Sequence, residues 1–185
     1  MARCRRDPHE VTIYSPRVPV VCGVMKILLC IFGTLLLVAS SCSPWPSAAV
    51  LPVKVEGVAM KPALNDGDRI FISRSFEKLE RGDIVIFYYP FDQRKSYIKR
   101  IIGLPNEKVE IRGGKVLVNG KDLEETYVDL ANNQSLMSQK EVAVPADAFY
   151  VMGDNRDNSY DSRSWGPLAR KFVYGKFLSK YFAAE

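Results

Sequence analysis

The amino-acid sequence predicts a mainly β domain of antiparallel strands, carried on one N-terminal transmembrane helix. Two observations indicate this fold class. From residue 53 onwards, short apolar runs are divided by turns rich in glycine, which is typical of a β domain. Before them, residues 18–38 are nearly continuously apolar, and crossing a bilayer takes about 20 residues. The chain of 185 residues therefore divides into a basic tail at 1–19, an anchor at 20–42 and one domain at 43–185.

The distribution of charge predicts how this anchor is oriented. The net charge is +5, but residues 1–26 alone hold five basic and two acidic side chains, whereas the rest hold 21 basic and 19 acidic ones. The positive excess precedes the apolar stretch, where the positive-inside rule places cytoplasmic residues. We therefore expect a single-pass protein of the inner or plasma membrane with its domain on the extracytoplasmic side. Its expected partners include membrane lipid and exclude nucleic acid.

The apolar stretch allows alternatives to a retained anchor. As an anchor, it has Lys26 near the inner edge, where its stem can snorkel to the headgroups, and Trp45 at the outer boundary. A cleaved signal peptide with small residues at 39–41 or 47–49 fits the same segment. A lipoprotein modified at Cys42 is a further alternative. All of these place the rest of the chain outside the cytoplasm.

The strands of the domain are expected where apolar or alternating runs lie between turn residues. Arg112-Gly113-Gly114 predicts a hairpin turn, and the polar stretch Asn132–Gln139 predicts an excursion from the sheet. The expected strands are 53–55, 69–73, 84–89, 96–102, 108–111, 115–118, 142–144, 149–152 and 172–177.

Cysteine and histidine usage excludes several classes of protein. Cys4, Cys22, Cys30 and Cys42 all precede the domain, so it has no disulfide framework and no metal-ligand spacing, and we expect neither metal nor cofactor. The single histidine, His9, lies in the basic tail. Hydrolases of the Ser-His-Asp or Cys-His kind need a histidine beside the nucleophile, so the domain belongs to neither kind.

Four segments of the domain carry a specific pattern. They are 55–64 (VEGVAMKPAL), 81–83 (RGD), 97–105 (YIKRIIGLP) and 153–163 (GDNRDNSYDSR). In order and spacing they resemble the bacterial type I signal peptidases, which remove signal peptides from exported proteins. The resemblance extends from the apolar stretch to the C-terminus, and it implies the folded antiparallel β domain of that family.

The resemblance implies a lysine-based catalytic site. The family cleaves peptide bonds with a serine nucleophile and a lysine general base, so it needs no histidine. By resemblance Lys99 is the base, and the hydroxyl of Ser159 orients its amine. A lysine accepts a proton near neutral pH only if burial lowers its pKa from about 10.4. Ile98, Ile101 and Ile102 adjoin Lys99 in the sequence and would supply apolar surroundings.

The resemblance also implies supporting and substrate-binding residues. Asp161 and Arg163 would pair and, with Asp154, hold the polar segment in place. Signal peptides end in small residues at alternate positions, as in Ala-x-Ala, because an extended peptide points every second side chain into the enzyme. Such a peptide would add a strand along residues 53–57 and along the lysine strand. Its shallow pockets would be lined by Val53, Val55, Gly57, Met60 and Ile98.

Residue 59 departs from the family pattern. In Gly-x-Ser-Met-x-Pro-Thr-Leu the serine attacks, but Ala59 stands at that place here, and Ala63 replaces the threonine. An alanine cannot form an acyl-enzyme, although its backbone N–H would still donate to the oxyanion site. Three explanations remain open: an engineered inactivating change, a natural protein that does not cleave, or an attack taken over by another hydroxyl, with Ser159 the first choice.

Two functions follow from the resemblance. The first is a membrane serine endopeptidase that cleaves signal peptides of exported preproteins by a Ser/Lys mechanism, either inactivated at Ala59 or working through a substitute. The second is a catalytically silent relative that captures signal peptides or pilin-like substrates. Self-cleaving repressors of the DNA-damage response share the Ser/Lys chemistry, but they lack an anchor and carry a DNA-binding domain. The sequence makes no prediction of oligomeric state.

Overall fold

A computed structural model describes residues 50–181 of the protein. The expected tail at 1–19 and anchor at 20–42 lie outside these residues, as do His9, Trp45 and the four cysteines. Between residues 50 and 181, no helix is both long and apolar enough to cross a membrane.

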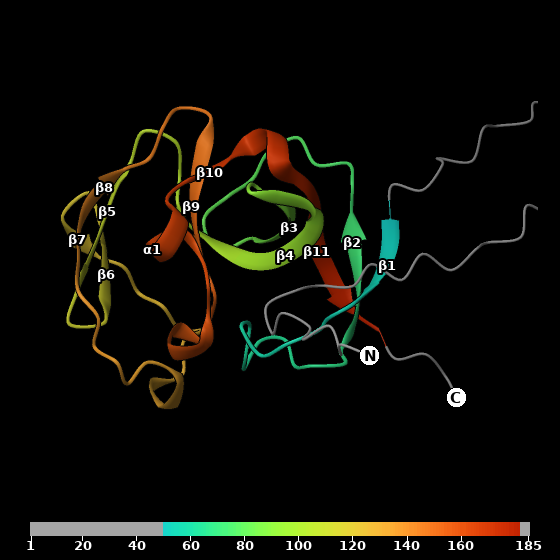
Figure 1. Cartoon of the computed structure of the whole chain (residues 1–185), viewed down its shortest axis with the longest axis horizontal. Coiled ribbons are helices and arrows are strands. Elements are labelled where there is room, and N and C mark those ends of the chain that lie inside the picture. Colours follow the sequence, from blue (N-terminus) through green and yellow to red (C-terminus); the bar gives the residue numbers. More distant parts are fainter. Residues whose placement is uncertain (1–49, 182–185) are drawn as a thin grey trace, which may run out of the picture.

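The described residues form two antiparallel sheets. In Figure 1 the small sheet lies on the left and most of the large sheet on the right, with α1 and the large-sheet strand β9 between them. The large sheet has the order β1-β2-β11-β3-β4-β9-β10, and the small sheet has the order β7-β6-β5-β8. The strands are β1 (Val50–Lys54), β2 (Arg69–Ser73), β3 (Ile84–Tyr89), β4 (Asp92–Gly103), β5 (Lys108–Arg112), β6 (Lys115–Val118), β7 (Lys121–Asp122), β8 (Gln139–Ala143), β9 (Ala148–Met152), β10 (Leu168–Ala169) and β11 (Val173–Lys180). The helical elements are α1 (Ser162–Trp165) and the 3-10 turns η1 (Leu130–Asn132), η2 (Arg156–Asn158) and η3 (Arg170–Phe172).

The prediction of a mainly β, antiparallel domain is confirmed. β2, β3 and β6 have the predicted bounds, whereas β4 begins four residues earlier than expected, at Asp92. The predicted hairpin joins β5 to β6, with Arg112 opposite Lys115. Gly113 and Gly114 both have positive φ, which a two-residue hairpin turn of this kind requires. β7 and β10, of two residues each, are too short for an apolar pattern to mark them.

Three clusters of buried apolar side chains form the core, and β4 contributes to all three. Ile98 belongs to the cluster under β1 and β2, Ile101 to an aromatic-rich cluster, and Ile102 to the cluster of the small sheet. The first four residues of β3 are buried on both faces, which explains why the sequence IVIF is apolar without alternation. β4 is therefore the strand on which the two sheets and their cores meet.

Candidate active site

Lys99 lies on the central strand β4 with none of its surface exposed. It is opposite Val85 of β3, and its Nζ donates a hydrogen bond of 3.1 Å to the carbonyl oxygen of Ile98. The amine also lies 5.6 Å from the ring centroid of Tyr97. A lysine that is wholly buried is rare, since taking an ammonium out of water is costly. The position of Lys99 therefore agrees with a functional site better than with a solvated strand lysine.

The apolar surroundings of Lys99 differ from those expected from its sequence neighbours. Side chains of a strand alternate between two faces, and residues opposite each other share a face. Because Lys99 is opposite Val85, it faces the aromatic-rich cluster that includes Val85, Tyr97 and Ile101. Ile98 belongs to the cluster under β1 and β2. Ile102 belongs to the cluster of the small sheet, so only Ile101 of the three isoleucines expected around Lys99 belongs to the cluster that Lys99 faces.

The end of β9 brings the other candidate residues to Lys99. Arg100 and Ile101 are opposite Met152 and Val151, so continuing this register by one residue places Gly153 beside Lys99. A Cβ atom on Gly153 would overlap the hydroxyl of Ser159 and lie 2.5 Å from the carbonyl oxygen of Ala59. The turn that holds Ala59 and the segment that holds Ser159 therefore meet at Gly153.

The turn around residue 59 is fastened to the polar segment 153–163 through backbone oxygens. The backbone N–H of Asn155 donates to the carbonyl of Ala59 at 3.0 Å, and its side-chain amide donates to the carbonyl of Val58 at 3.1 Å. Ala59 itself is 6% exposed. The backbone that would carry a hydroxyl at residue 59 is thus already hydrogen-bonded to the segment that carries Ser159.

Ser159 is held by the buried carboxylate of Asp161. The Ser159 hydroxyl donates to Oδ2 of Asp161 at 2.7 Å, and the same oxygen accepts from the backbone N–H of Gly153 at 3.0 Å. Arg163, the partner expected from the sequence, donates to Asp161 through Nε at 2.8 Å and Nη2 at 2.9 Å. A hydroxyl has one proton to donate and two lone pairs. Since the proton is used on Asp161, the lone pairs remain available to an amine.

The pKa of Asp161 gives a prediction on pH. Burial acts to raise this pKa, but the bonds from Arg163, Gly153 and Ser159 outweigh it and hold the pKa below its usual value. The stabilisation is therefore complete above the unfolded pKa of about 3.9 and is lost as the pH falls through the folded pKa. The difference in free energy of unfolding between the parent and Asp161→Asn should narrow below about pH 4, at up to about 1.4 kcal/mol per pH unit. Urea unfolding of both proteins at several pH values measures this difference. A difference that stays constant as the pH falls below about 4 would contradict the lowered pKa of Asp161.

Gly153 gives a second prediction, since a Cβ there has no room. Gly153→Ala must move the Ala59 carbonyl or Ser159, and in an Ala59→Ser background we expect at least about a 100-fold loss of peptide cleavage. Gly67→Ala is the control, because Gly67 has a φ of +86° and open space around it. It costs backbone strain of about 1–2 kcal/mol and leaves the site unchanged. Equal cleavage by the two variants would mean that the contact at Gly153 has no part in the site.

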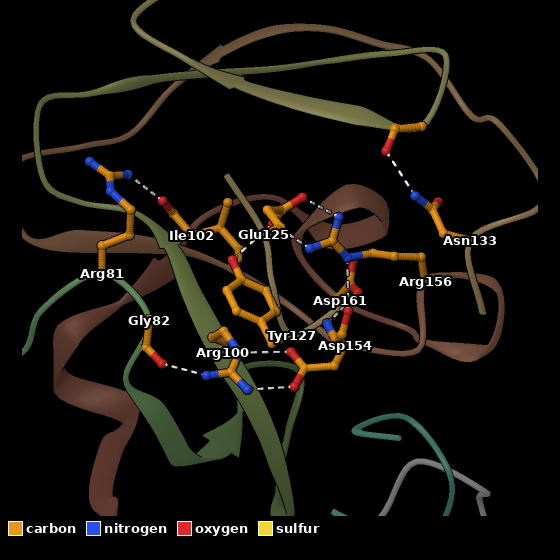
Figure 2. A network of polar contacts seen from close by, with 12 residues as sticks. Arg81, Gly82, Arg100, Ile102, Glu125, Tyr127, Asn133, Asp154, Arg156 and Asp161 are labelled. Atoms are coloured by element: carbon orange, nitrogen blue, oxygen red, sulfur yellow. Dashed lines mark hydrogen bonds and ion pairs between the residues drawn. The ribbon is translucent and has the colours of Figure 1, made fainter. Parts of the chain in front are cut away.

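Asp154, the other expected supporting residue, pairs with Arg100 of β4 (Figure 2). Arg100 donates to both carboxylate oxygens, at 2.8 and 2.5 Å, and its third nitrogen donates to the carbonyl of Gly82 at 2.7 Å. The Asp154 side chain is 1% exposed and that of Arg100 11%. Burial raises the pKa of Asp154, and the bonds to Arg100 offset the rise only in part. The pair joins β4 to the polar segment just beyond Lys99.

The residues expected to bind substrate come from β1, from the turn that follows it and from β4. Val53, Val55, Met60 and Ile98 are at most 3% exposed and belong to one apolar cluster. Gly57 has a φ of 94°, and its N–H donates to Asp66 at 2.8 Å. Gly57 is half-buried, whereas the other four are core residues of the domain, so any contact of those four with a peptide would come from the few atoms at their edges.

The sequence analysis predicted no role for three residues that lie in this region: Arg100, Glu125 and Tyr127. Arg100 alone had a signal, since an arginine between Ile98 and Ile102 on one face of an apolar strand indicates a buried charge. Glu125 and Tyr127 lie in a loop, where no periodicity distinguishes them. For metal ions, residues 50–181 contain no group of three or more His, Cys, Asp or Glu side chains that could hold one.

Comparison with protein families gives a match over most of the chain. The model of the family described as "Signal peptidase, peptidase S26" matches residues 24–182. The curated protein "Signal peptidase I" of Leptolyngbya laminosa is 40% identical over 135 residues, which cover 67% of this chain and 64% of that protein. "Signal peptidase I V" of Bacillus subtilis (strain 168) is 35% identical over 143 residues, which cover 70% of this chain and 84% of that protein.

Two further comparisons concern length and solved structures. "Probable signal peptidase I-2" of Synechocystis sp. is 39% identical, and the match covers 59% of it, so the chain spans less than two thirds of this relative and of the one from Leptolyngbya laminosa. A crystal structure of a signal peptidase I from Enterococcus faecalis V583 has 32% sequence identity and a TM-score of 0.47. The match covers 57% of this chain and 100% of that one.

Proposed function

The chain belongs to the signal peptidase family, peptidase S26, and from that premise we propose that its domain recognises the C-terminal end of signal peptides at a Ser/Lys site that lacks only the attacking hydroxyl. One observation carries the proposal. Lys99 is fully buried on β4 at the position where the turn of Ala59 and the segment of Ser159 meet over Gly153.

In this proposal Lys99 is the general base. Its surroundings of Val85, Tyr97 and Ile101 are apolar, and burial disfavours the charged form of an amine. Ser159 would accept a hydrogen bond from the amine with a lone pair that its bond to Asp161 leaves available. Asp161, Arg163 and Asp154 would keep that arrangement fixed.

The proposed substrate path is strand addition between β1 and β4. β1 ends the large sheet, and β9 is opposite β4 only at Arg100–Gly103. Ahead of Lys99, β4 is therefore paired on one side only, with β3 at Asp92 and at residues 96–98. Val53 of β1 and Ile98 of β4 belong to one cluster, which indicates that the two strands come close. An extended peptide entering there would find backbone groups on both sides and small recesses for alternate side chains. A peptide ending in Ala-x-Ala has the side chains that fit them.

Residue 59 decides what the protein does with such a peptide. Without a hydroxyl there, no acyl-enzyme forms at residue 59, and the chain binds the peptide without cutting it by that route. The second candidate, attack by Ser159, is favoured by its position beside the Ala59 carbonyl. It is disfavoured by the donation of its hydroxyl proton to Asp161.

Cleavage of an Ala-x-Ala peptide in detergent separates these functions. The proposal predicts no cleavage by the chain as it stands and cleavage by Ala59→Ser. Cleavage by the unaltered chain that Ser159→Ala stops would show that Ser159 attacks. An inactive Ala59→Ser variant that still binds the peptide would identify a silent binding protein.

The proposal also covers the location of the protein. We propose that residues 20–42 anchor it in the inner or plasma membrane and that the domain faces the extracytoplasmic side, because the positive excess lies in residues 1–26. The substrates would then be signal peptides of exported preproteins, presented at the membrane surface.

A further inference from the structure

A segment of the small sheet reaches across to the candidate active site. We call this segment, residues 123–138 between β7 and β8, the strap. Figure 2 shows that two of its side chains, Glu125 and Tyr127, lie among Arg100, Asp154 and Arg156. No sequence pattern predicted these contacts, and the site as described above does not account for them.

Glu125 holds Arg156, which borders the point where the site residues meet. Both carboxylate oxygens of Glu125 accept from Arg156, at 2.9 and 2.5 Å, and Nε of Arg156 donates to the carbonyl of Gly153 at 3.1 Å. The side chain of Glu125 is 10% exposed and that of Arg156 is 2% exposed. A charge buried to this degree is costly without its partner, so Glu125 fixes the place of Arg156 and, through it, that of Gly153.

Tyr127 covers Arg100, the residue after Lys99. The Tyr127 ring centroid lies 4.1 Å from the guanidinium carbon of Arg100, a cation–π contact on a half-buried face. The Tyr127 hydroxyl donates to Glu125 at 2.9 Å. Burial raises the pKa of Tyr127, so its hydroxyl keeps the proton that it donates. This hydrogen bond therefore links the contact of Glu125 with Arg156 to the contact of Tyr127 with Arg100.

A third contact fastens the far end of the strap to the same polar segment. The carboxylate of Asp157 accepts from the backbone N–H groups of Gln134 at 2.8 Å and Ser135 at 3.0 Å. Arg156 and Asp157 are consecutive and lie three and two residues before Ser159. The strap is therefore held at two separate points by the segment that carries Ser159.

From these contacts we infer that the strap is a positioning element of the active site: through Arg156 and Arg100, Glu125 and Tyr127 hold Gly153 beside Lys99. The consequence for cleavage rests on the proposed function, whereas the ordering of the 153–161 segment does not. Glu125 and Tyr127 are positioning residues in this inference, since they act through the two arginines.

The ordering is tested on the full chain as it stands, in detergent, by hydrogen exchange and mass spectrometry. Glu125→Gln keeps the size of the side chain and removes its charge. We expect exchange to become at least about tenfold faster in peptides from 151–161 and 96–102, and to stay unchanged in β2 and β11. Glu110→Gln is the matched control, because it breaks the exposed Glu110–Arg112 pair on the same small sheet. Tyr127→Phe, which loses only the hydroxyl, should show a smaller effect at the same peptides.

The catalytic consequence is tested in the Ala59→Ser background. Glu125→Gln should lower kcat for an Ala-x-Ala peptide by about 10- to 100-fold and change KM less than about threefold, because misplaced groups slow the reaction while the peptide still lies along β1 and β4. Glu125→Asp should recover part of kcat. If Glu125 had a purely structural role, the loss of kcat in Glu125→Gln would instead be proportional to the fraction of the protein that is unfolded.

Each outcome decides one point. Exchange in Glu125→Gln that matches Glu110→Gln, or that rises equally over the whole domain, overturns the inference. Exchange that rises locally while kcat equals that of the Ala59→Ser parent overturns the catalytic part of it. If the Ala59→Ser parent does not cleave, the proposed function fails, and the exchange result still decides whether the strap orders the segment.

Discussion

Ala59→Ser is expected to convert the protein into an endopeptidase that cuts after Ala-x-Ala. Removing the nucleophile of subtilisin, an unrelated serine protease, lowers turnover about 10⁶-fold, so restoring one to an otherwise complete site should raise the rate by up to about that factor. The backbone at residues 58 and 59 is already held by Asn155, so a serine at residue 59 would be carried by a turn that is fixed against the segment of Ser159. The rate of peptide cleavage in detergent, followed by mass spectrometry, measures the gain.

Two further variants show whether Lys99 supports that activity. Ala59→Ser combined with Lys99→Met should be inactive, because methionine fills a similar volume and accepts no proton. Ala59→Ser combined with Lys176→Met is the control, since Lys176 pairs with Asp83 at a half-exposed site of β11. Cleavage that survives the loss of Lys99 would contradict the assignment of the base.

Asp154→Ala is expected to destabilise the domain by about 3–5 kcal/mol, the usual cost of removing one partner of a buried ion pair. Arg100 would keep its charge with 11% of its side chain exposed and with only the Gly82 carbonyl left to accept from it. The loss is measured by urea unfolding of the full chain near neutral pH. Since a domain of this size is typically stable by about 5–15 kcal/mol, the variant should approach the limit of folding.

Asp92→Ala is the control for this prediction. It breaks the pair of Asp92 with Arg94, whose side chain is 91% exposed. Pairs of this kind contribute little in water, so this variant should unfold like the parent. If Asp154→Ala and Asp92→Ala have the same effect, the pair that joins β4 to the polar segment is not what holds the domain together.

The sequence predicted the sheets well, because apolar runs and glycine turns are local signals. IVIFYY and KVLV were recognisable as strands from composition alone, and the Gly113-Gly114 turn predicted the hairpin between KVLV and the strand before it. The order of the strands was not predictable in this way. β11 lies between β2 and β3, and such a non-local pairing leaves no trace in periodicity.

The candidate site was predicted in part. The segments at 97–105 and 153–163 identified Lys99, Asp154, Ser159 and Asp161 through a family resemblance. The side of β4 that Lys99 faces followed only from its pairing with Val85. Glu125 could not be predicted, because its partner Arg156 is 31 residues away and the loop between β7 and β8 has no pattern of its own.

The central claim, that a buried lysine amine is the base for residue 59, is tested most directly by the pH dependence of kcat/KM for Ala59→Ser. Only an amine without its proton can accept one, so kcat/KM should rise with pH, approaching about tenfold per unit where the protonated amine predominates, and then level off. A rate that is constant from about pH 5 to about pH 9 would mean that no such group titrates in the free enzyme, and Lys99 would then not be the base.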